Sequence, residues 1–100
     1  MNLEIHKTLV VSTAHLTKEV AEMYNAFGTE DEYPCDLMRP RWVRNEGWML
    51  YVPETITGLD VINTPDCISD VIAVAIKNKC QWIMFDSDGP LIEGLPVFKW

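Results

Sequence analysis

The sequence Cys-Gln-Trp-Ile-Met-Phe-Asp-Ser-Asp-Gly-Pro-Leu-Ile occupies residues 80–92 and joins a short apolar run to an acidic turn. The four bulky apolar residues 82–85 predict a buried strand. Asp86 and Asp88 follow at the end of this strand, just before a Gly-Pro turn. We expect Asp88 to hydrogen-bond the backbone of the turn and Gly89 to adopt a positive φ. A strand that delivers acids to a turn is a common base for a binding site and an equally common way to end a strand.

Two amphipathic helices are predicted upstream of this strand. The first spans residues 17–27, with Thr17 as the N-cap. The second spans residues 65–79 and opens with Thr64 as the N-cap and Pro65 at the first helical position. Each helix carries one apolar stripe, made by Val20, Met23, Tyr24 and Phe27 in the first and by Ile68, Val71, Ile72, Ala75 and Ile76 in the second. Each stripe needs one face of a sheet to cover it.

Further strands are predicted at residues 5–13, 41–44 and 48–52, with a short last strand at residues 95–98. The element order predicts an α+β fold, a two-layer sandwich in which two helices cover one face of a mixed sheet of four to five strands. Right-handed crossovers make the first, middle and fourth strands parallel, as in a short βαβ arrangement. A true hairpin at residues 41–52 favours a ferredoxin-like arrangement instead. In either case we expect the helix stripes to be buried together with Val10, Leu50 and Ile83 or Phe85.

The composition favours a single globular domain over residues 1–100, since hydrophobic residues make up 48% of the chain and charged residues 23%. The N-terminus shows no signal-peptide pattern, and no apolar run is long enough to span a bilayer. Cys35, Cys67 and Cys80 form an odd set without metal-ligand spacing. We therefore expect reduced thiols in a cytoplasmic protein, with Cys67 and Cys80 in the core.

The charge balance is strongly acidic, with eight basic residues against fifteen acidic ones and a net charge of −7. Direct binding of nucleic acid is disfavoured, because it needs a basic surface and only Arg39, Arg41 and Arg44 cluster. A strong negative field steers cationic partners, including proteins that themselves bind nucleic acid. Simple solubility is the alternative explanation.

Residues 85–91 are similar to the first motif of haloacid dehalogenase-type phosphatases, a hydrophobic strand followed by Asp-x-Asp-Gly-Thr. That likeness implies a nucleophilic Asp86 and an acid/base Asp88 near a magnesium ion. However, Pro90 stands in the place of the threonine, and only the eleven residues 90–100 follow Gly89, which leaves no chain for the later motifs. We therefore expect no catalytic residues, no cofactor and no metal.

His15 follows the first predicted strand, close to Ser12. In the parallel arrangement, Ser12, His15, Asp86 and Asp88 meet at one edge of the sheet, where open α/β sheets bind ligands. A small metal-dependent hydrolase, or a metal- or ligand-binding domain that uses Asp86, Asp88 and His15, is the alternative function. The opposing interpretation is that His15 only precedes the helix and that the neighbouring hydroxyl groups cap it.

A proline-punctuated loop is predicted between the first helix and the hairpin, over residues 29–40. Glu30, Asp31 and Glu32 form a short acidic run in it. Arg41, Trp42 and Arg44 follow, and tryptophan with arginine is the usual anchor of a protein interface. These six residues are the predicted partner-binding site.

Three segments resemble a family of small uncharacterised proteins carried on bacterial plasmids, integrated elements and phages. They read Val-Ser-Thr-Ala-His-Leu-Thr at 11–17, Gly-Trp-Met-Leu-Tyr-Val-Pro at 47–53, and Asp-Ser-Asp-Gly-Pro with a closing Leu-Pro-Val-Phe-Lys-Trp within 80–100. The likeness does not extend to residues 28–46 and 54–64. It implies an accessory protein of a mobile element or phage in a bacterial cytoplasm. Together with the acidic charge, it predicts a non-enzymatic protein that binds a host protein, as an inhibitor of a host defence nuclease or its complex.

Overall fold

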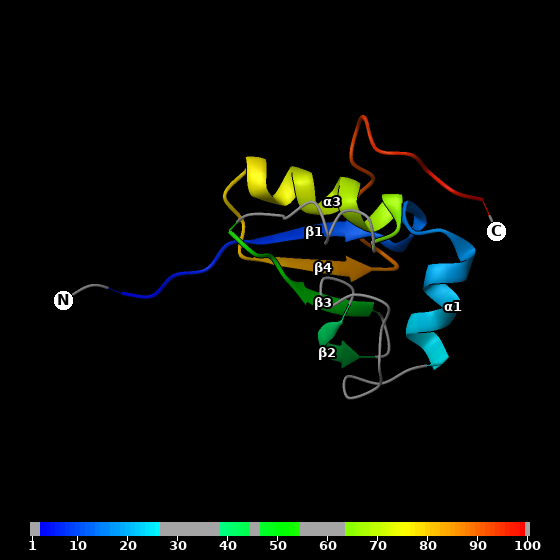
Figure 1. Cartoon of the computed structure of the whole chain (residues 1–100), viewed down its shortest axis with the longest axis horizontal. Coiled ribbons are helices and arrows are strands. Elements are labelled where there is room, and N and C mark those ends of the chain that lie inside the picture. The colour runs from blue at the N-terminus through cyan, green and yellow to red at the C-terminus, as the bar shows by residue number, and fades with distance from the viewer. Residues whose placement is uncertain (1–2, 27–38, 45–46, 55–63, 100) are drawn as a thin grey trace.

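A four-stranded mixed sheet forms one layer of the protein (Figure 1). The computed structural model describes residues 3–26, 39–44, 47–54 and 64–99, apart from the side chains of residues 42–44. The strands are β1 (Thr8–Ser12), β2 (Pro40–Arg44), β3 (Gly47–Tyr51) and β4 (Trp82–Asp86). Their order is β1-β4-β3-β2, with β1 parallel to β4, β3 antiparallel to β4 and β2 antiparallel to β3.

The predicted hairpin is present, and it reverses the direction of the middle strand. The expectation that the first, middle and fourth strands are all parallel is therefore wrong for β3. β1 and β4 are the first and last strands along the chain, and β4 lies between β1 and β3 in the sheet. The sheet is consequently mixed, as predicted.

The helical elements are the 3₁₀ turn η1 (Thr13–His15), α1 (Lys18–Ala26) and α3 (Asp66–Lys77). Thr17 caps α1 as predicted, because its Oγ1 accepts the Val20 N–H at 3.3 Å. The predicted N-cap of α3 is wrong. Pro65 occupies that position with an extended ψ of 145°, and Thr64 is buried one residue earlier.

Both helices cover the same face of the sheet. α1 contributes Tyr24, whose ring centroid lies 5.0 Å from that of Trp48 on β3. The core joins this face to the helices through Val11, Leu16, Val20, Tyr24, Trp48, Leu50, Val52, Cys67, Ile68, Val71, Ile72, Ala75, Cys80, Ile83 and Phe85. The prediction of two helices on one face is confirmed, with Met23 and Ile76 partly buried at its margin. The predicted core residue Phe27 lies outside the described residues.

Val10 is not part of this core, contrary to expectation. Side chains alternate between the two faces of a strand, and the register pairs Val11 with the buried Phe85. Val10 therefore faces the opposite side beside Met84, and 38% of its surface is exposed.

The C-terminal segment after β4 does not form the predicted last strand. Pro96 has no N–H to donate to a sheet ladder, and its carbonyl oxygen lies 2.8 Å from the Nδ1 of His15. The Phe98 N–H donates to the Ala14 carbonyl at 2.9 Å, which holds the segment against η1. Cys67 and Cys80 are free and buried, as predicted, and Cys35 lies outside the described residues. None of the helices in the described ranges is long and apolar enough to cross a membrane.

Candidate functional site

The end of the sheet where β1 and β4 finish brings two of the predicted edge residues together. Because these strands are parallel, Ser12 and Asp86 are partners in the register. The Ser12 Oγ accepts the Ala14 N–H at 3.0 Å, so it caps η1 as the hydroxyl-capping interpretation predicts. The Ser12 N–H donates to the Pro90 carbonyl at 2.9 Å. The chain that follows β4 therefore crosses the end of β1.

The acidic turn is held by Asp86, whereas the sequence predicted Asp88. The Asp86 Oδ1 accepts the Asp88 N–H at 2.9 Å, and the Asp86 carbonyl accepts the Gly89 N–H at 2.9 Å. The Asp88 residue itself is exposed. Gly89 does not adopt a positive φ, and what requires glycine there is space. A Cβ atom on Gly89 would lie 2.8 Å from the carbonyl carbon and oxygen of Val11.

His15 is buried, with 1% of its surface exposed, and its ring binds the C-terminal segment. Its Nδ1 lies 2.8 Å from the Pro96 carbonyl oxygen, and its Nε2 lies 2.8 Å from the Ile92 backbone nitrogen. A carbonyl only accepts and a backbone N–H only donates, so the ring carries its hydrogen on Nδ1. Both ring nitrogens are thus used to fasten residues 92–96 to η1.

The predicted ligand edge is therefore only partly assembled. Ser12 and Asp86 are adjacent, whereas Asp88 is exposed and both nitrogens of His15 are bonded to backbone groups. A small cavity of about 220 Å³ at this edge is lined by Ser12, Thr13, Ala14, Ser87 and Phe98. Within the described ranges, no group of three or more histidine, cysteine, aspartate or glutamate side chains is placed to hold a metal ion.

A larger cavity, of about 430 Å³, opens between the N-terminal ends of α1 and α3. Its lining residues are Thr17, Glu19, Val20, Met23, Pro65, Asp66, Cys67 and Phe98. Most of these side chains are apolar, and the two carboxylates come from the first turns of the two helices. Sequence reasoning missed this cavity, because α1 and α3 are separated by some 40 residues of chain and no local pattern indicates that their ends converge.

Among the residues that the structure describes, acidic side chains are concentrated at this same end of the molecule. Figure 1 shows that the ends of β1 and β4, the start of α3, α1 and the C-terminal segment all lie there. The acids carried by these elements are Glu19, Glu22, Asp66, Asp70, Asp86, Asp88 and Glu93. Lys18 lies 3.9 Å from Glu22 as an exposed ion pair, and Lys99 is the other basic residue of these segments.

The opposite end of the sheet is richer in lysine. Lys7 precedes β1 and donates from Nζ to the Asn78 carbonyl at 2.8 Å, while Lys77 and Lys79 lie at the C-terminal end of α3. We call the two regions the acidic end and the lysine end. The topology places these charged residues at two ends, because β1 and β4 are parallel and α3 begins at the end of the sheet where they finish.

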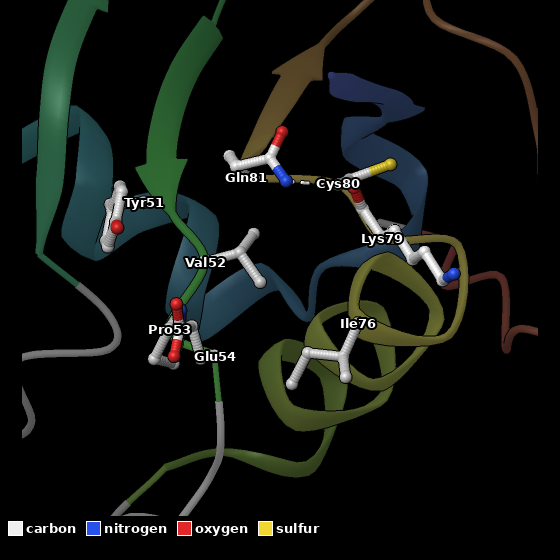
Figure 2. A pocket seen from close by; sticks show the side chains of 8 residues that line it. All are labelled: Tyr51, Val52, Pro53, Glu54, Ile76, Lys79, Cys80 and Gln81. Atoms are coloured by element: carbon white, nitrogen blue, oxygen red, sulfur yellow. Dashed lines mark hydrogen bonds between the residues drawn. The ribbon is translucent and has the colours of Figure 1, made fainter. Parts of the chain in front are cut away.

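The lysine end holds a cavity of about 260 Å³ between the end of β3 and the C-terminus of α3 (Figure 2). Lys79 is one of its lining residues and has a backbone φ of 59°, and its side-chain ammonium group points away from Glu54 (Figure 2). The Lys79 carbonyl accepts the Gln81 side-chain amide at 3.0 Å. The lining of this cavity is more polar than that of the cavity between α1 and α3.

The protein-family comparison covers nearly all of this structure. A family model described as the C-terminal domain of a family of unknown function (DUF5983) matches residues 8–100. The chain belongs to this family. The match begins at the first residue of β1, so the DUF5983 domain contains every described strand and helix as well as both ends of the sheet. No curated protein and no solved structure matches the chain.

The predicted partner-binding residues also fall within the DUF5983 domain. Arg41 is exposed on β2, an edge strand of the sheet. The structure describes only the backbone of Trp42 and Arg44, and the run from Glu30 to Glu32 lies outside the described residues. Their part in binding stays a prediction.

Proposed function

We propose that this chain is a non-enzymatic binding protein whose acidic end engages a positively charged surface on a partner protein. The observation that carries the proposal is the separation of charge along the sheet. Carboxylates from two helices, the acidic turn and the C-terminal segment are brought to one end, and Lys7, Lys77 and Lys79 lie at the other.

Such a charge distribution acts at long range. At physiological ionic strength the field of a charged surface extends about 8 Å before salt screens it. Several acids on one end, in a chain of net charge −7, therefore orient the molecule before contact and speed association with a basic surface. A uniform acidic coat would improve solubility without this orientation.

The partner class that fits this chemistry is a host protein that binds nucleic acid. A channel built for phosphates is lined with lysine and arginine, and an acidic end of this kind competes for it. We propose that the chain serves a phage or another bacterial mobile element in the cytoplasm as an inhibitor of a host defence nuclease or its complex. The net charge of −7 supports this role.

The hydrolase alternative rests on His15, Asp86 and Asp88, and the geometry does not favour it. A reaction at this edge would need a ring nitrogen of His15, and both are bonded to residues 92–96. The Asp86 carboxylate is engaged by the backbone of its own turn.

The test is capture of partners from bacterial lysate with matched charge variants. One variant neutralises two exposed acids of the acidic end, Asp70→Asn with Glu93→Gln. The control neutralises two exposed acids elsewhere, Glu4→Gln with Glu54→Gln, and so changes the net charge equally.

We expect the first variant to lose the captured partner and the control to retain it. With the purified partner, association should slow only in the first variant, and the difference should shrink as salt is raised. Equal capture by both variants, with folding intact, would show that the acidic end is not the contact surface.

A further inference from the structure

The cavity between α1 and α3 is lined mostly by apolar side chains, which the overall acidity of the chain does not explain. It holds about 430 Å³, within the range of sites that receive small groups, and its walls include Val20, Met23, Pro65 and Phe98. Val20 and Cys67 on its wall belong to the buried core, so the cavity is continuous with a rigid part of the fold. An apolar hollow of this kind favours an apolar occupant, because filling it removes apolar surface from water.

Two carboxylates flank the hollow. Glu19 and Asp66 are exposed residues in the first turns of α1 and α3, and both line the cavity. Within the described part of the chain, neither side chain has an ion-pair partner. At these positions they also complement the positive N-terminal ends of the helix dipoles. The two helix ends are thus already neutralised, and the cavity does not favour an anion.

We propose that this cavity receives an apolar side chain from a partner segment in which lysine or arginine flanks that side chain. The charge complementarity selects this occupant: the apolar group enters the hollow, while the flanking cations lie over Glu19 and Asp66. The inference rests on the proposed function and names the partner's chemistry at its contact point. Charges bring the partner in quickly, and the buried side chain slows its release.

The test uses short peptides and does not require the host partner. The probe is acetyl-Lys-Lys-Leu-Lys-Lys-amide, titrated into isotopically labelled protein and followed by NMR. The controls are the same peptide with glycine in place of leucine and the peptide acetyl-Glu-Glu-Leu-Glu-Glu-amide. We expect only the first peptide to produce saturable shifts at the Met23 methyl group and the Phe98 ring.

Matched variants then separate the cavity from the rest of the acidic end. Glu19→Gln with Asp66→Asn should weaken the leucine peptide about five- to tenfold, since each exposed charge contributes up to about 1 kcal/mol. Glu22→Gln with Asp70→Asn makes the same charge change on the same helices outside the cavity lining and should leave affinity within about twofold. Met23→Trp, which fills the hollow, should abolish the shifts at the Phe98 ring. If that variant does not fold, the two charge pairs still decide the question.

Three results would overturn the inference. The first is equal binding of the leucine and glycine peptides, which would indicate charge attraction without the cavity and leave the proposed function standing. The second is equal weakening by the two charge pairs. The third is concentration-dependent shifts at the cavity without any peptide, which would identify a second copy of this chain as the occupant. Failure to capture a partner from lysate would instead count against the proposed function alone.

Discussion

Replacement of His15 by alanine should detach the C-terminal segment from the body of the domain. The change removes two partly buried hydrogen bonds, from Nδ1 to the Pro96 carbonyl and from the Ile92 N–H to Nε2, each 2.8 Å long. A typical hydrogen bond contributes about 1 kcal/mol, and leaving a buried partner unsatisfied costs about 1–3 kcal/mol. Removing the imidazole also leaves a void, because the side chain is 1% exposed.

These contributions sum to a loss of about 3 kcal/mol in the free energy of unfolding. That is a large share of the roughly 5–15 kcal/mol available to a small domain. The loss should appear in urea unfolding followed by tryptophan fluorescence, as a lower midpoint. The Ile92 amide, now without its acceptor, should exchange with solvent faster than the amides of β4.

The other histidine supplies the control. His6 is exposed, and its Nδ1 accepts the Trp82 Nε1–H at 3.0 Å near the surface. His6→Ala should therefore change the free energy of unfolding by no more than about 0.5 kcal/mol. The reasoning is refuted if His15→Ala unfolds like the wild type and Ile92 exchange is unchanged. It is also refuted if nitrogen NMR of the wild type places the His15 hydrogen on Nε2.

Three other perturbations probe separate features of the chain. A Cβ at Gly47 would overlap the Phe85 carbonyl oxygen, so Gly47→Ala must push β3 from β4 and should cost about 3 kcal/mol or more; near-wild-type melting would contradict this close approach. Lys79 has a φ of 59°, so Lys79→Gly should relieve backbone strain and raise the free energy of unfolding by up to about 1 kcal/mol, which calorimetry will detect; a drop would mean that the lysine side chain contributes more than the strain costs. Charge reversal at residues 30–32 should slow association with a captured partner and weaken its salt dependence, whereas Trp42→Ala should speed dissociation; unchanged kinetics in both would remove this surface from the interface and favour the acidic end.

Local structure was predictable from the sequence because its causes are local. Periodicity of 3.6 residues identified α1 and α3, the Thr17 hydroxyl marked the start of α1, and the apolar run 82–85 identified β4. The alternation of strands and amphipathic helices was enough to predict a two-layer sandwich. The errors at this level were a small shift in the start of α3, after Pro65, and a predicted strand at residues 95–98 that does not form.

The site required the tertiary structure, because its contacts join residues that are remote along the chain. His15 and Pro96 are separated by 81 positions, and nothing beside either residue indicates the other. The carboxylate that binds the acidic turn could be either Asp86 or Asp88 until the path of the turn was known.

The sequence by itself determined the acidity of the chain, the positions of the helices and the strand that ends in Asp86. Only the tertiary structure decided which face of β1 is buried, which strands are neighbours, and that the N-terminal ends of α1 and α3 enclose an apolar cavity between two acids. The physical reason is that helix and strand formation depends on side chains a few residues apart. Strand order and the convergence of helix ends depend instead on how the whole chain buries its apolar surface at the lowest free energy.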